Sequence, residues 1–232
     1  MNAPKAWDVY DEALPFTGAI YGKQRVRMAI LGIGKGALLV VSPGGPMTEE
    51  DWRHVDGLGT PRFLLAPNSY HNGGLAAWKG RYPEATVVAH PRALKRLRAQ
   101  VPGVAIDDLS ALEAALPSGM RLLSPPMAKQ GETWVSATTS DGIAWFVTDA
   151  LVNEARLPPG AVGFAARLIG FRTGLMTNPI FKRIFLKDKA AYKAWVSAEL
   201  DRDRPTLFVP SHGDVVRGSD VIDQLRAATN AA

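Results

Sequence analysis

RFLLAPNSYHNGG, residues 62–74, is the stretch from which the fold is predicted. Its apolar first half indicates a buried strand over 62–66, and its polar second half places His71 just past the end of that strand. Two later stretches have the same arrangement, since IAWFV at 143–147 precedes Asp149 and TLFV at 206–209 precedes His212. Ligands and metals gather where the strands of an α/β protein end, so these three side chains predict a site at such an edge.

The rest of the chain alternates strand-like and helix-like segments, which favours the α/β class. Residues 25–31 and 37–41 form strand-like runs separated by Gly32, Gly34 and Gly36, a pattern typical of a β-hairpin. Thr48 precedes three acidic residues and predicts the N-cap of a helix. Further strands are expected at 85–89 and 133–138, with a hairpin turn at 139–142, and helices at 75–82, 93–99, 190–200 and from about 219.

Length and composition indicate one globular domain over 1–232, with a basic apolar insertion at about 155–188, although two small domains remain open. The chain has 232 residues, of which 47% are apolar and 21% charged. It has no cysteine, which excludes disulfides and thiolate metal ligands. We expect a soluble cytoplasmic protein, because no apolar run approaches the roughly 18 residues that a membrane span requires.

The net charge of +5 is concentrated in one segment. Residues 155–187 contain six basic side chains and no acidic one, so the remainder of the chain carries about −1, from 5 − 6. Such a segment predicts contact with an anion, a phospholipid headgroup or an acidic partner. Nucleic acid is not expected as a partner, since the chain shows neither a broad basic face nor a known binding motif.

A family resemblance emerges from the order of these motifs, namely an early hairpin, then His71-Asn72-Gly73-Gly74, then Thr148-Asp149, then Pro210-Ser211-His212-Gly213. The chain resembles the metallo-β-lactamase superfamily. It is similar in particular to an uncharacterised branch with a Tyr-His motif followed by Trp-Lys and Tyr-Pro, here at 78–79 and 82–83. The resemblance implies an α/β fold of the αββα sandwich type, with the site along one edge of two sheets.

The resemblance also implies which metal ligands this chain has lost. The first metal-binding loop of the superfamily usually reads His-x-His-x-Asp-His, and the matching positions here are Ala66, Asn68, Tyr70 and His71. Only the last ligand is retained, and a later histidine of the superfamily would fall near Ala128. The first metal position has therefore lost its three histidines, and a degenerate site is expected.

The second metal position keeps three of its four ligands by the same resemblance, with Asp149 as the bridging carboxylate and His212 as the last histidine beside His71. Two imidazoles and a carboxylate are suited to one Zn²⁺, Mn²⁺ or Fe²⁺ with open positions for water and substrate. The alternative is a relic polar cluster without metal, in which each His bonds backbone and the Asp caps a turn.

The function expected from this site is hydrolysis of a small ester-like or anionic substrate with at most one metal. Tyr70 and Asp214 are the candidate proton-transfer residues, although a capping role fits Asp214 better. Asn68 and His90 are candidate substrate contacts, although His90 before Pro91 fits a helix entry better. The alternative function is a non-catalytic protein that binds a small molecule or a partner on the same fold. His54, in a charged helix, is expected to be solvated.

The segment 157–186 mixes apolar side chains with arginine and lysine and lies between the Asp149 and His212 motifs in sequence. It predicts a lid, a substrate channel or a pair of helices on a membrane surface. The alternative, favoured slightly by the sequence, is a helical hairpin that covers a sheet edge or forms a homodimer interface.

Overall fold

The computed structural model describes residues 5–23 and 25–232. The chain divides into two compact units, of which unit 1 ends at Leu122 and unit 2 begins at Leu123. Each unit contains a β-sheet, α-helices and its own apolar core. The expectation of a single domain stays a prediction.

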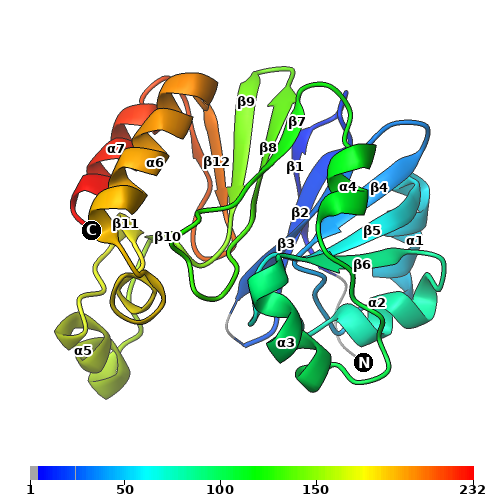
Figure 1. Cartoon of the computed structure of the whole chain (residues 1–232), viewed down its shortest axis with the longest axis horizontal. Coiled ribbons are helices and arrows are strands. Elements are labelled where there is room, and N and C mark those ends of the chain that lie inside the picture. The colour runs from blue at the N-terminus through cyan, green and yellow to red at the C-terminus, as the bar shows by residue number, and fades with distance from the viewer. Residues whose placement is uncertain (1–4, 24) are drawn as a thin grey trace. The chain divides into compact units, whose positions relative to one another are not determined.

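Unit 1 is built on a six-stranded sheet in which every strand pairs with its neighbours in sequence, in the order β1-β2-β3-β4-β5-β6 (Figure 1). The first four strands form an antiparallel meander, and β4, β5 and β6 run parallel to one another. The carboxyl ends of these last three strands therefore lie at one edge of the sheet. The strands are Trp7–Asp11 (β1), Phe16–Tyr21 (β2), Val26–Gly32 (β3), Ala37–Val41 (β4), Thr60–Ala66 (β5) and Thr86–Ala89 (β6).

The helices of unit 1 connect and follow the parallel strands, as parallel pairing requires. Thr48 caps the first helix through a capping box with Asp51, which confirms the predicted N-cap. A second anchor is Trp78, whose indole Nε1 donates to the Gly44 carbonyl at 2.8 Å from inside the core. The helices are Glu49–Leu58 (α1), Leu75–Arg81 (α2), Pro91–Gln100 (α3) and Ser110–Ala115 (α4).

Unit 2 contains a five-stranded sheet in the order β13-β12-β9-β8-β7 and a separate two-stranded ribbon of β10 and β11. The boundary between the units falls within β7. The hairpin of β8 and β9 forms as predicted, with its turn at Ser140-Asp141. The strands are Met120–Leu123 (β7), Trp134–Thr139 (β8), Gly142–Val147 (β9), Leu151–Glu154 (β10), Gly174–Thr177 (β11), Leu207–Pro210 (β12) and Val216–Arg217 (β13).

The helices α6 (Lys189–Asp203) and α7 (Val221–Asn230) lie side by side next to the sheet of unit 2 (Figure 1). Their buried side chains, such as Tyr192 and Leu225, share a core with Trp134 and Trp145 of the sheet. The buried Asp203 at the end of α6 accepts hydrogen bonds at 2.7 Å from the Trp145 indole and from a serine hydroxyl. These bonds compensate the desolvation of the carboxylate and fix the end of α6 against the sheet.

The segment between β9 and α6 differs from the predicted helical hairpin. It contains the ribbon β10–β11, one α-helix, α5 (Gly160–Leu168), and a five-residue π-helical turn, η1 (Phe181–Phe185). The hairpin prediction was wrong because residues 174–177 pair as a strand with 151–154 instead of continuing a helix. Two short strands, β1 and β2, were also not predicted.

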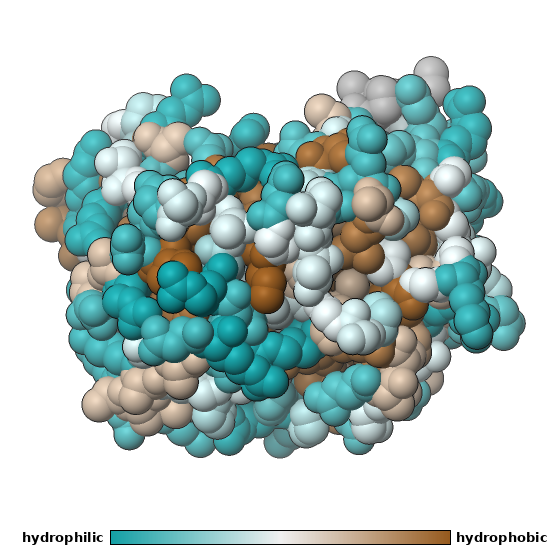
Figure 2. All heavy atoms as spheres, turned by 90° about the horizontal axis from the view of Figure 1, so that it is seen from above, coloured by the Kyte–Doolittle hydropathy of each residue, from teal (hydrophilic) through white to brown (hydrophobic). Residues whose placement is uncertain are grey.

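The surface in Figure 2 is mainly hydrophilic or weakly polar, with apolar patches between the polar side chains. Scattered apolar side chains on such a face are ordinary for a folded protein. In residues 5–23 and 25–232, no helix has both the length and the apolar character needed to cross a membrane.

His54 on α1 is half-buried, which contradicts the expectation of a solvated side chain. Its ring stacks on Trp7 with the centroids 4.4 Å apart, and its buried Nε2 has no hydrogen-bond partner among the described residues. Burial lowers the pKa of His54 below 6.5, although the charge of Asp51 opposes this shift. The folded state thus favours the neutral imidazole.

We predict that protonation of His54 destabilises the fold. The unfolded chain binds this proton more readily than the folded one. The stabilising contribution of the neutral His54 ring to the free energy of unfolding is therefore complete above pH 6.5 and is lost as the pH falls through the lowered pKa. Urea unfolding of wild type and His54→Gln between about pH 8 and about pH 5 measures this loss of stability. Wild type should lose more stability than the variant; parallel curves would contradict the prediction.

Candidate metal centre

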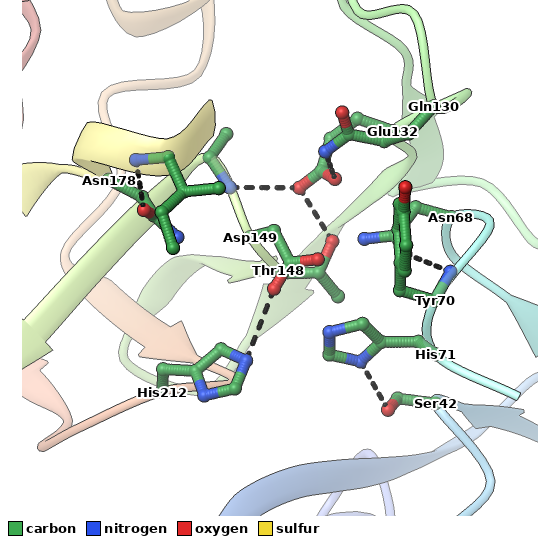
Figure 3. Close-up of polar contacts among 12 residues, drawn as sticks. Ser42, Asn68, Tyr70, His71, Gln130, Glu132, Thr148, Asp149, Asn178 and His212 are labelled. Carbon is green, nitrogen blue, oxygen red and sulfur yellow. Dashed lines mark hydrogen bonds and ion pairs between the residues drawn. The ribbon is translucent and has the colours of Figure 1, made fainter. Parts of the chain in front are cut away.

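Asp149 and His212 are brought together by two adjacent parallel strands of unit 2. The register places Val147 of β9 opposite Pro210 of β12, and the Ser211 amide donates to the Val147 carbonyl at 2.8 Å. Both strands end there, so the residues that follow emerge at the same edge of the sheet. Figure 3 shows the His212 ring directed at the Asp149 carboxylate, with Nε2 3.1 Å from Oδ1. The two side chains are 22% and 20% exposed, so solvent reaches both.

The loop that carries Asp149 is held by a buried carboxylate, Glu132 (Figure 3). Its Oε1 accepts from the Thr148 hydroxyl at 2.6 Å and from the Ala150 amide at 3.1 Å, the residues on either side of Asp149. The Trp134 indole donates to the same oxygen at 3.1 Å. The sequence analysis missed Glu132; the available signal was an acidic residue two positions before the strand β8.

The backbone after His212 is fixed against the start of the β10–β11 ribbon. The Asn153 amide donates to the His212 carbonyl at 3.0 Å, and the Asp214 amide donates to the Asn153 carbonyl at 2.8 Å. Gly213 has φ +95°, and a Cβ added to it would lie 1.8 Å from the Asn153 carbonyl oxygen. Only glycine fits this close approach, so Gly213 allows His212 to be held beside the ribbon.

His71 lies in unit 1, in the loop that follows β5, as predicted. It is buried, and its Nδ1 is 2.8 Å from the hydroxyl of Ser42, the residue after β4. The Tyr21 hydroxyl is 3.1 Å from the same Ser42 oxygen. Ser42 therefore fixes the orientation of the His71 ring from the neighbouring parallel strand. Sequence reasoning missed Ser42, whose position after an apolar run was the one available signal.

The remainder of the His71 loop is compact. Asn68 is fully buried and its Oδ1 accepts from the Tyr70 amide at 2.8 Å, which is an Asx-type turn. Gly74 ends the loop with its amide 3.0 Å from the Pro43 carbonyl, where a Cβ would approach that oxygen to 2.4 Å. Tyr70 is 45% exposed, and the Arg96 guanidinium lies over its ring at 4.4 Å. The substrate role predicted for Asn68 and the proton-transfer role of Tyr70 stay predictions.

The other predicted side chains have evident structural surroundings. His90 caps α3, with Nδ1 accepting from the Arg92 amide at 3.1 Å, which confirms the helix-entry reading. Burial and the charge of Arg92 lower the pKa of His90. Asp214 is exposed, and Ala128, where the superfamily pattern would have a histidine, is buried in the core of unit 2. Substrate contact by His90 and proton transfer by Asp214 stay predictions.

We predict that Gly213→Ala destabilises the protein more than the same substitution at a glycine that also has a positive φ but has free space around its added Cβ. The matched control is Gly174→Ala, at φ +87° with no atom near its added Cβ. The control should cost about 1–2 kcal/mol from the left-handed backbone, and Gly213→Ala more than about 3 kcal/mol, because the Asn153 carbonyl must move. Urea unfolding measures both; equal losses would contradict the close approach.

Glu132→Gln should destabilise unit 2 through the Asp149 loop. An amide in place of the carboxylate weakens three hydrogen bonds at one oxygen and leaves buried donors poorly paired, at a cost of about 1–3 kcal/mol. Thermal unfolding compared with the exposed Glu113→Gln on α4 measures the effect. A variant as stable as this control would show that Glu132 does not hold the loop.

Known proteins resemble the chain in structure and not in sequence. No protein-family model matches it, and no curated protein matches it. Among solved structures, the metallo-β-lactamase VMB-1 superimposes with a TM-score of 0.64 at 10% identity, over 100% of this chain and 99% of the other. FIM-1 from Pseudomonas aeruginosa, a metallo-β-lactamase in a mono-zinc form, gives 0.62 at 12% identity, over 99% and 96%. A metallo-β-lactamase from Erythrobacter litoralis gives 0.61 at 14% identity, over 100% and 99%. The predicted α/β fold class is thereby confirmed: the chain has the metallo-β-lactamase fold.

Proposed function

We propose that the protein is a metal-dependent hydrolase that binds one divalent ion and acts on a small ester-like or anionic substrate. The observation that carries this proposal is the pair formed by Asp149 Oδ1 and His212 Nε2, 3.1 Å apart at the ends of two parallel strands. A carboxylate and an imidazole in contact, both open to solvent, are the donors that Zn²⁺, Mn²⁺ and Fe²⁺ share.

We propose His71 as the third ligand. Its Nδ1 is engaged by Ser42, which leaves Nε2 as the ligand atom. A metal-binding histidine usually has its other ring nitrogen fixed in this way, because the bond sets the tautomer and the ring orientation. The solved lactamases also match the full chain, including the segments that carry all three residues.

We propose that the site holds one ion. Three side chains that each offer one ligand atom suit a single ion with open coordination positions and are too few for a pair of metals, which supports this proposal. A bound divalent metal supplies a Lewis acid and lowers the pKa of a coordinated water. Glu132 then positions Asp149, and Ser42 positions His71, through the hydrogen bonds described above.

Proton transfer is assigned to two exposed side chains. Tyr70 presents its phenol at the surface under Arg96, and Asp214 presents its carboxylate from a backbone fixed by Asn153. Either group can exchange protons with a reacting oxygen that comes within hydrogen-bond reach. Asn68 and His90 are the proposed substrate contacts. Their role is secondary, because Asn68 is buried and accepts from the Tyr70 amide, and His90 caps α3.

A non-catalytic ligand-binding protein is the second candidate function. It is favoured by two positions at which the superfamily pattern has a metal-binding histidine and this chain does not. Asn68 forms a turn there, and Ala128 is buried in the core of unit 2. The fold alone does not decide between the two, because one fold carries many functions.

We predict a stoichiometry of one divalent metal per chain. Purified protein is loaded with Zn²⁺ or Co²⁺, dialysed and measured by elemental analysis. Asp149→Asn and His212→Asn should each lower affinity by more than about 100-fold, beyond the roughly 10–100-fold typical of an outer-shell partner, whereas His54→Gln should match wild type. Two metals per chain would contradict the ligand set.

The same measurement separates the remaining alternatives. Retained affinity in His71→Asn would confine the site to the unit 2 pair and remove the proposed third ligand. Absence of metal after dialysis would favour the binding-protein function. Metal-loaded protein is then assayed with p-nitrophenyl esters and phosphodiesters; hydrolysis that is abolished by a chelator and by Asp149→Asn supports the enzyme, and full metal occupancy without turnover supports the alternative.

A further inference from the structure

The helix α5 exposes its large apolar side chains instead of burying them. Six of the eight exposed large apolar or aromatic side chains among the described residues lie between 162 and 184. On and directly after α5, Val162 is 67% exposed, Phe164 62%, Leu168 70% and Ile169 45%. At about 100° per residue, these four positions span roughly 160° of the helix surface. This is the reverse of the usual surface helix, whose apolar face points to the core.

The buried side of α5 lies opposite its apolar face. Gly163 is the one buried residue of the helix, and a Cβ added to it would lie 1.7 Å from the Pro158 carbonyl oxygen. At about 100° per residue, Gly163 lies on the side of the helix opposite the four exposed apolar residues, so their side chains point away from the buried side. Figure 1 shows α5 at the periphery of unit 2, beyond the β10–β11 ribbon.

The apolar face is accompanied by unneutralised positive charge. Residues 155–187 contain six basic side chains and no acidic one. In the part of the chain that the structure describes, none of the six takes part in an ion pair. A partner that covers this segment must therefore be apolar where it meets α5 and anionic around it.

A pocket at the end of α5 has the chemistry of an anion site. It has a volume of about 160 Å³ and is lined by Arg172, Lys182 and Arg183, together with Gly170 and the end of α7. Lys182 Nζ donates to the Ala231 carbonyl at 3.0 Å, and the Arg183 guanidinium donates to the Ile169 carbonyl, which ties the pocket to α5. Burial and four neighbouring cations lower the pKa of Lys182, so an anion there would relieve a crowded positive charge.

We propose that this segment binds the surface of an anionic phospholipid bilayer. The apolar face of α5 enters the boundary between headgroups and acyl chains, which such helices penetrate by about 5–10 Å. Arg172, Lys182 and Arg183 bind a lipid phosphate in the pocket. This binding mode is peripheral, and it is independent of the proposed metal chemistry.

Charge favours the bilayer over a second copy of this chain. A symmetric dimer through α5 would place the same surface of both copies in contact and bring two copies of this basic segment, which contains no acidic residue, close together. An anionic bilayer instead attracts every one of these charges, each Lys or Arg near its surface contributing about 1 kcal/mol.

Vesicle co-sedimentation of the full chain tests the proposal. The protein should bind vesicles of phosphatidylcholine mixed with phosphatidylglycerol, and not phosphatidylcholine alone. Raising the salt from about 0.1 M to about 1 M, which shortens the Debye length from about 10 Å to about 3 Å, should weaken binding strongly. Binding that is equal for both vesicles, or insensitive to salt, would overturn the electrostatic part of the proposal.

Two double variants test the two parts of the surface. Phe164→Ser with Leu168→Ser should weaken vesicle binding by more than about tenfold, because both side chains are exposed and contribute little to the fold. Arg172→Gln with Lys182→Gln should weaken it by about 30-fold, from about 1 kcal/mol per charge. The matched controls are Val9→Ser, an exposed apolar residue of unit 1, and Arg62→Gln with Lys95→Gln; they should bind like wild type.

Other occupants of the surface give distinct results that would overturn the proposal. A dimer in light scattering that Phe164→Ser with Leu168→Ser dissociates, without vesicle binding, would assign the face to a second copy. Calorimetric binding of inorganic phosphate to the Arg172 pocket, without vesicle binding, would assign it to a free anion. Absence of vesicle binding, dimer and phosphate binding would leave the surface without a ligand role.

Discussion

Parallel pairing of β9 with β12 is the constraint on which the candidate metal centre of unit 2 depends. The two strands are separated by about sixty residues in sequence, yet their register brings Val147 opposite Pro210. Because both run in the same direction, their carboxyl ends meet at one edge, and Asp149 and His212 emerge together. A shift of one residue would turn one of the two side chains to the other face of the sheet. The geometry of the pair is therefore a consequence of sheet register.

Hydrogen bonds from residues distant in sequence convert this placement into fixed side-chain directions. Glu132 binds the backbone and hydroxyl groups that flank Asp149, and Ser42 binds the ring of His71. A buried carboxylate is costly unless several donors satisfy it, and Glu132 receives three at one oxygen. The buried charge of Glu132 orients a candidate metal ligand through the residues beside it. Groups behind a metal site usually act in this way.

Unit 2 departs from ordinary globular construction in the segment that contains α5. A surface helix normally gains most of its stability by burying an apolar stripe, since short helices are marginal by themselves. In the nine-residue α5 only Gly163 is buried, and Phe164 and Leu168 are exposed to solvent. The exposed apolar area, in a segment with six basic side chains and no acidic one, is the observation from which we propose membrane binding.

The sequence by itself determined the strands and helices whose signals are local, such as the hairpin at 26–41 and the cap at Thr48, and it identified the strand ends that carry His71, Asp149 and His212. It missed β1, β2 and the β10–β11 ribbon, which are short, contain Gly, Asp or Asn, and form only because a partner strand completes their hydrogen bonds. The hydrogen bonds of Glu132 and the outward direction of the apolar face of α5 were likewise decided by tertiary structure. The physical reason is that pairing register, burial and hydrogen bonding between residues far apart in the chain depend on the whole fold, whereas periodicity and capping depend on a few neighbours.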